Sequence, residues 1–208
     1  MTNRNWLGRA TITGAALVLI AAMAFTACSK KEGGSGGSSD GGSASAVKGL
    51  KETPASDFNY KATDDGKGVV ITKYSGNGGA VVIPAQIEGL PVVEIDAASF
   101  RGEYRGPDVG YDITSVVIPA SVKLISFNAF NKCEKLTSVT IMGTGVVLDG
   151  FAFGKCINLT EFKFPDNEKA LIPFDDEGHI RGTTAFEGCT KLPLAVRGKL
   201  KDMGFDEP

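Results

Sequence analysis

Apolar side chains recur at a fixed interval in the second half of the chain, and that interval is 23 residues. The stretches Val122–Gly143 and Val146–Asp166 place aromatic, cysteine and aliphatic residues at matching positions. The pairs that lie 23 apart are Phe130 and Phe153, Cys133 and Cys156, Leu136 and Leu159, Val139 and Phe162, and Ile141 and Phe164. A period of about 20 to 29 residues with the apolar spacing L-x-x-L-x-L is typical of leucine-rich solenoids. The pattern therefore predicts a β-rich repeat solenoid whose short strands stack at a 23-residue period.

Two apolar columns predict how each coil closes its core. The inward pairs of successive strands are Val81 and Ile83, Val116 and Ile118, Val139 and Ile141, and Phe162 and Phe164. The opposite side of each coil carries Ile95 or Ile125 and then an aromatic column of Phe100, Phe130, Phe153 and Phe186. A coil this short has no other way to bury its apolar residues, so we expect the two columns to face each other.

The terminal parts of the repeat region depart from the period. Phe58–Ala62 and Val69–Tyr74 are β-prone runs on either side of the turn sequence DDGKG, so they predict a β-hairpin that caps the first coil. A separate small domain is disfavoured, since about 30 residues cannot support a core. In the last coil Ala195 and Arg197 stand where the inward pair is expected. We assign the leucine-rich domain to residues 58–198 and a polar C-terminal tail to residues 199–208.

Two insertions interrupt the period. Seven extra residues lie near Gly102–Asp112, and this stretch with its flank carries interface-prone residues that form a candidate binding loop: Arg101, Tyr104, Arg105 and Tyr111. The alternative is that the loop only spans a wider coil. Ten extra residues lie near Asn167–Gly182. Three adjacent acids at 175–177 could contribute oxygen ligands to a calcium ion, but they lack the spaced pattern of a calcium-binding loop. A solvated loop is the favoured reading, and no metal site is predicted.

The first 27 residues have the pattern of an export signal, with Arg4 and Arg9 followed by an uncharged stretch from Ala10 to Ala27. The sequence FTAC at residues 25–28 resembles the lipobox of bacterial lipoproteins, although Phe25 departs from the usual aliphatic residue. This resemblance implies a lipoprotein signal peptide at 1–27 and acylation of Cys28. The Gly/Ser-rich residues that follow predict a flexible tether over 28–57. An uncleaved membrane anchor and simple secretion are the alternatives.

The repeat also resembles a known family. IPASV at 118–122, Ile125, Ala129-Phe130 and Cys133-x-x-Leu136-x-x-Val139-x-Ile141 are similar to the BspA-like leucine-rich repeat. The sequence VVIPAQIEGLPVVEI after the predicted hairpin also resembles the start of such domains. The resemblance covers residues 58 to about 198. It implies a curved solenoid at a bacterial surface or within the envelope, serving in binding or adhesion. We therefore expect a lipid-anchored protein of the cell envelope, most readily at the outer membrane or cell surface.

Charge and cysteine positions restrict the chemistry further. Without residues 1–27 the chain has 20 basic and 24 acidic residues, scattered through the repeats, which argues against a nucleic-acid partner because such a partner would require a basic face. Cys133, Cys156 and Cys189 share one repeat position. Neighbouring coils would bring such thiols within disulfide reach, but an odd number favours a ladder of buried free thiols. In similar repeats this position packs and hydrogen-bonds the turn.

No catalytic residues or cofactors are predicted, because the single histidine, His179, has no nucleophile or metal-ligand cluster at a useful spacing. The chain is expected to bind a protein or glycan ligand. Residues flanking the inward position of each strand should point outward on the concave sheet, and they form the candidate binding face: Ser115, Val117, Ser138, Thr140, Glu161 and Lys163. A carbohydrate- or peptidoglycan-binding accessory protein and a self-associating envelope scaffold remain the alternatives.

Overall fold

The computed structural model describes residues 50–101, 112–173 and 182–206. The predicted signal peptide at 1–27, Cys28 and most of the tether lie outside the described residues. The same holds for Tyr104, Arg105 and Tyr111 of the candidate loop, for the acids at 175–177 and for His179.

Short strands dominate the described chain, with one 3-10 turn before them and one α-helix after them. The turn η1 covers Ala55–Asp57, and the helix α1 covers Leu194–Asp202. The strands are β1 Phe58–Ala62, β2 Val69–Tyr74, β3 Gly79–Val82, β4 Gln86–Ile87, β5 Leu90–Ile95, β6 Ile113–Ile118, β7 Leu124–Ile125, β8 Ser138–Ile141, β9 Val146–Leu148, β10 Glu161–Lys163 and β11 Leu171–Ile172.

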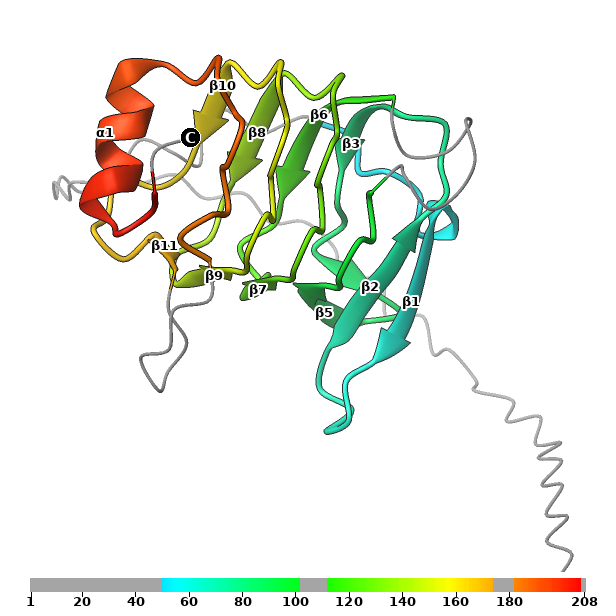
Figure 1. The fold of residues 1–208 in the computed structure, drawn as a ribbon. Helices are drawn as coiled ribbons and strands as arrows, with labels where there is room; N and C mark the ends of the chain where they lie inside the picture. The colour runs from blue at the N-terminus through cyan, green and yellow to red at the C-terminus, as the bar shows by residue number, and fades with distance from the viewer. Residues whose placement is uncertain (1–49, 102–111, 174–181, 207–208) are drawn as a thin grey trace, which may run out of the picture. The chain divides into compact units, whose positions relative to one another are not determined.

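The strands form two sheets on opposite sides of the coils (Figure 1). Sheet A has the order β1-β2-β5-β7-β9-β11, with β4 paired to β5, and sheet B has the order β10-β8-β6-β3. The coil-to-coil pairings in both sheets are parallel, as expected when each coil repeats the path of the one before. The predicted leucine-rich solenoid is confirmed. So is the strand alignment, since Val81, Val116, Val139 and Phe162 pair successively across sheet B.

The N-terminal β-hairpin cap is also confirmed. β1 and β2 have the predicted bounds and pair antiparallel, and β2 then pairs parallel with β5, which joins the hairpin to sheet A. In the turn, the Asp65 carboxylate accepts hydrogen bonds from Thr63 Oγ1 at 2.6 Å and from the Lys67 N–H at 3.0 Å. These bonds, the one from Thr63 first, lower the pKa of Asp65.

The core contains the predicted aromatic column. Phe100, Phe130, Phe153 and Phe186 are all at most 1% exposed, and their rings stack in sequence with centroid separations of 4.5, 5.1 and 5.7 Å. Tyr74 extends the stack at the N-terminal end, 5.2 Å from Phe100. Because the coils advance by about one strand spacing of 4.8 Å, residues at one repeat position meet at the distance that favours offset stacking.

The three cysteines beside this column are free and completely buried. Each thiol donates to the backbone carbonyl of the phenylalanine in the preceding coil. The Sγ–O distances are 3.4 Å from Cys133 to Phe100, 3.2 Å from Cys156 to Phe130 and 3.0 Å from Cys189 to Phe153. The buried thiol ladder is thus confirmed. Burial raises the pKa of Cys133. The pKa of Cys156 is raised mainly by a hydrogen bond with the thiol of Cys189 and then by burial.

The structure corrects the predicted boundaries at both ends. The end of the predicted tether is docked: the Thr53 N–H donates to Val82 O at 2.9 Å, and the Val82 N–H donates to Thr53 Oγ1 at 3.0 Å. Residues 199–208 are not simply a polar tail, because α1 runs through Asp202 and both Leu200 and Phe205 are buried. Phe205 packs edge-on against Phe186 at 5.3 Å, which covers the end of the column.

The second insertion is also different from the prediction of one continuous loop. Leu171 and Ile172 within it form β11, which pairs parallel with Val146 and Val147 of β9. Leu171 is buried, so this part of the insertion completes another coil instead of leaving the solenoid. Alternating apolar and polar residues are too few in a two-residue strand to identify it from the sequence.

Candidate functional site

The outward face of sheet B places all six predicted face residues in two rows. Ser115 pairs with Ser138 and Ser138 with Glu161, while Val117 pairs with Thr140 and Thr140 with Lys163. Ala80 and Val82 of β3 begin the same two rows. Each of the six is half-buried or exposed, whereas Val116, Val139 and Phe162 between them are buried. The alternation of the strands thus produces a flat polar surface over a buried apolar layer.

Some polar side chains on this face already have hydrogen-bond partners within the protein, and others do not. Ser138 Oγ donates to Glu161 Oε2 at 2.7 Å, and Lys163 Nζ lies 2.5 Å from Glu161 Oε1. These contacts, Lys163 first and Ser138 second, lower the pKa of Glu161, which is therefore ionised at neutral pH. The hydroxyls of Ser115 and Thr140 have no side-chain partner among the described residues. A ligand lying across the strands would find free hydroxyls at the centre and an ion pair at one edge.

Only Arg101 of the candidate binding loop lies within the described residues, where it is half-buried and follows Phe100. The role of the loop as a binding site stays a prediction.

An aromatic pair made of exposed Phe127 and half-buried Phe151 was missed by the sequence analysis. Phe127 is 49% exposed, and its ring meets that of Phe151 edge to face, with centroids 6.0 Å apart. Neither residue belongs to the aromatic column, which contains Phe130 and Phe153 instead. The signal was available, because two phenylalanines in consecutive coils stand next to the column and outside its register.

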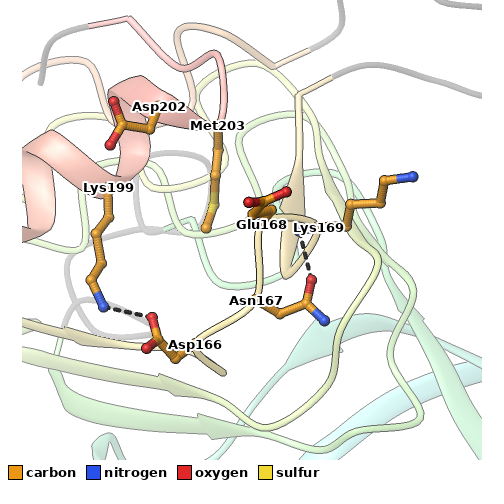
Figure 2. Close-up of a pocket in the computed structure, with 7 residues that line it drawn as sticks. All are labelled: Asp166, Asn167, Glu168, Lys169, Lys199, Asp202 and Met203. Carbon is orange, nitrogen blue, oxygen red and sulfur yellow. Dashed lines mark hydrogen bonds and ion pairs between the residues drawn. The ribbon is translucent and has the colours of Figure 1, made fainter.

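A pocket of about 630 Å³ lies between the end of α1 and the segment that follows β10 (Figure 2). Lys199 Nζ binds Asp166 Oδ1 at 2.8 Å, which lowers the pKa of Asp166, and the Lys169 N–H donates to Asn167 Oδ1 at 2.8 Å. The charges of both signs largely offset each other within the pocket. The lining residues are Asp166, Asn167, Glu168, Lys169, Lys199, Asp202 and Met203.

Neither a membrane-spanning helix nor a cluster of metal ligands is found among the described residues. None of the helices there has the length and apolar character needed to cross a bilayer. No group of three or more His, Cys, Asp or Glu side chains in the same residues is placed to hold a metal ion.

The repeat architecture has known relatives. A family model described as the BspA type leucine rich repeat region, in six copies, matches residues 109–193. A crystal structure of a T. pallidum leucine rich repeat protein is 34% identical, with a TM-score of 0.54, and the match covers 68% of this chain and 69% of that one. The chain belongs to the BspA-type leucine-rich repeat family.

Two other solved leucine-rich repeat proteins are less similar in structure. A leucine rich cell surface protein from Faecalibacterium prausnitzii is 31% identical with a TM-score of 0.45, covering 56% of this chain and 31% of that one. A leucine-rich repeat protein from Bacteroides capillosus is 22% identical with a TM-score of 0.47, and the match covers 64% of this chain and 93% of that one. No curated protein is similar enough to be counted as a relative of this BspA-type chain.

Proposed function

We propose that this BspA-type protein is held in the bacterial cell envelope by a lipid on Cys28 and binds a protein partner through the outward face of sheet B. The observation that carries the binding proposal is the pair of in-register rows on β6, β8 and β10, with the free hydroxyls of Ser115 and Thr140 at its centre. An extended segment or a loop of a partner can lie flat there, because the side chains are short and the backbone below is fixed by parallel pairing.

Binding, and not catalysis, is the activity that this site supports. A repeat solenoid presents one extended surface to a partner, and the residues of each row come from different coils. Catalysis requires a nucleophile, a base and an orienting group to converge on one point, whereas the face holds hydroxyls and one ion pair in a plane.

The binding proposal is tested by blocking the face with a bulky charge. We expect Thr140→Arg in the full chain to reduce site-specific crosslinking from a photoreactive residue at position 117 at least tenfold. Thr144→Arg is the matched control, since Thr144 is exposed in a turn outside the two rows. Equal crosslinking in both variants would place the partner elsewhere.

The anchor is tested separately. Metabolic labelling with an alkyne fatty acid should mark the wild-type chain and not Cys28→Ser, and the wild type should enter the detergent phase on phase separation. Protease treatment of intact cells then decides which way the domain faces. Digestion before the outer envelope is broken supports a surface role, while protection until then supports a partner inside the envelope. An unlabelled wild-type chain would refute the lipid anchor and leave the binding proposal intact.

A further inference from the structure

The strand β3 forms one edge of sheet B, whose order is β10-β8-β6-β3 (Figure 1). Alternate residues of a strand direct their backbone N–H and C=O groups to opposite sides. Ile83, which follows β3, donates its N–H to Val117 O on the β6 side at 3.0 Å. Val82 and Ala80 therefore direct their backbone groups away from β6. An edge of this kind is a template on which another chain can add a strand.

Residues 50–53, which we call the clasp, cover part of this edge. The Thr53 N–H donates to Val82 O at 2.9 Å, and Thr53 Oγ1 accepts from the Val82 N–H at 3.0 Å. Just beyond β3, the Ala85 N–H donates to Glu52 Oε1 at 3.2 Å. Two of these three bonds use a side-chain oxygen where a paired strand would offer a backbone carbonyl. The clasp is thus a substitute for a further strand of sheet B.

The clasp is held by little more than these hydrogen bonds. Leu50 is 53% exposed, Glu52 is exposed and Thr53 is half-buried, and none of them belongs to the hydrophobic core. Ordering a chain segment costs conformational entropy, and hydrogen bonds open to water offset only part of that cost. Segments with few buried contacts open locally at a lower free energy than global unfolding requires. We therefore expect the clasp to detach while the solenoid stays folded.

The sequence of β3 does not itself prevent strand pairing. Edge strands are usually kept from pairing by charged side chains or by proline. The strand β3 reads GAVV and has neither, whereas the opposite edge strand, β10, carries Glu161 and Lys163 at exposed positions. Ala80 is also exposed, and its backbone groups have no hydrogen-bond partner among the described residues. The clasp is therefore what guards this edge.

A second copy of the chain fits the edge once the clasp has moved. Two β3 strands related by a two-fold axis run antiparallel, and Ala80 of one copy can then lie opposite Val82 of the other. Both residues direct their backbone groups outward, so each such pair can exchange two hydrogen bonds. Because β3 has no charged residue, no like charges meet across the axis. The edge is thus complementary to itself.

We propose that the clasp is an autoinhibitory contact that prevents the edge of β3 from pairing with the same edge of a second copy. Its release produces a two-fold dimer in which sheet B continues from one copy into the other. Ala80 and Val82 begin the two outward rows of sheet B, so the rows of both copies join in the dimer. The clasp is the docked end of the predicted tether, and the segment that attaches the domain therefore also controls its edge.

The test measures the protein mass of the full chain in nonionic detergent by light scattering during size-exclusion chromatography, over a range of protein concentrations. Thr53→Pro removes the N–H donor and the hydroxyl acceptor together, and we expect its dimer to form at a concentration at least tenfold lower than that of the wild type. Lys51→Ala is the matched control, because Lys51 is exposed in the clasp and makes none of its hydrogen bonds. This control should behave as the wild type does.

Two further variants connect the dimer to the edge. Ala80→Pro, added to Thr53→Pro, removes an outward N–H at a position where an edge strand tolerates proline, and it should restore the monomer. Thr53→Val keeps the clasp N–H but removes the hydroxyl. At low protein concentration it should speed hydrogen exchange at least tenfold in residues 79–83 and leave residues 113–118 unchanged. Unchanged far-UV circular dichroism confirms that the variants fold.

Three outcomes overturn the proposal. Thr53→Pro could remain monomeric although exchange in residues 79–83 rises, which would show that a free edge does not pair. The dimer could survive Ala80→Pro, which would place the contact elsewhere. Exchange could be the same in Thr53→Val and the wild type, which would show that the clasp does not cover the edge. Crosslinking from position 117 of the wild-type chain, which tests the proposed function, is independent of all three.

Discussion

Replacing Phe153 by leucine tests whether stacked rings hold the coils together. Phe153 is fully buried and contacts three other rings: Phe130 at 5.1 Å, Phe186 at 5.7 Å and Phe162 edge-on at 5.3 Å. Leucine keeps most of the apolar bulk but removes every ring–ring contact. At about 0.5–1.5 kcal/mol for each aromatic pair beyond its area, three pairs amount to about 1.5–4.5 kcal/mol.

The assay is equilibrium unfolding in urea followed by far-UV circular dichroism. Phe127→Leu is the matched control, because it is the same substitution at an exposed ring with one aromatic partner, so we expect a loss of about 0.5–1 kcal/mol. Phe153 also lies in the middle of the column, and coils interact mainly with their neighbours. A large loss there should broaden unfolding or divide it into two steps. Equal losses for the two variants would show that stacking is not what stabilises the column.

Three further predictions concern two glycines and the buried thiols. Gly143→Ala should destabilise the fold by about 1–3 kcal/mol in thermal unfolding, because the added Cβ would lie 2.8 Å from Ala120 O. Gly198→Ala in α1 meets nothing within 4 Å and should stabilise the fold by about 0.4–1 kcal/mol. A more stable Gly143→Ala than Gly198→Ala variant would contradict this packing. The thiols of Cys133, Cys156 and Cys189 should react with a thiol reagent only after denaturant is added, and rapid labelling of the native chain would disprove their burial. The pKa values of Cys133 and Cys156 are raised in the folded chain, so as pH rises these thiols ionise first in the unfolded chain. The free energy of unfolding should therefore be unaffected below the unfolded thiol pKa and should fall above it, by about 1.4 kcal/mol per pH unit for each thiol. In a Cys133→Ala, Cys156→Ala variant the free energy of unfolding should fall less steeply with pH.

The repeated positions were predictable because the sequence states them several times. Val116 and Val139 are the same position in two coils, and a period that places them one above the other also fixes their parallel pairing. The cysteine ladder followed for the same reason, since a thiol at one repeat position must lie near the preceding coil. Each such prediction needed only the period and the inward or outward direction of a strand residue.

Features that occur once were not predictable in this way. The docking of Thr53 on β3 depends on one hydroxyl and one N–H group, and nothing in a Gly/Ser-rich segment indicates where it stops being a tether. The helix α1 contains Gly198 and follows Pro193, and its charged residues concealed the single buried position Leu200. The contact between Phe127 and Phe151 was overlooked because it depends on the path of the turn after each strand, where Phe151 has a positive φ.

The covered ends of the solenoid restrict where a partner can bind. At the N-terminal end Phe58 and Tyr74 close the column over Phe100, and at the C-terminal end Phe205 closes it over Phe186. Both caps consist of non-repeating structure, a hairpin and a helix, as is usual for the terminal units of a solenoid. The aromatic column is thus closed at both ends, and the outward residues of the two sheets run along the sides of the coils. The polar rows of sheet B lie along one of those sides.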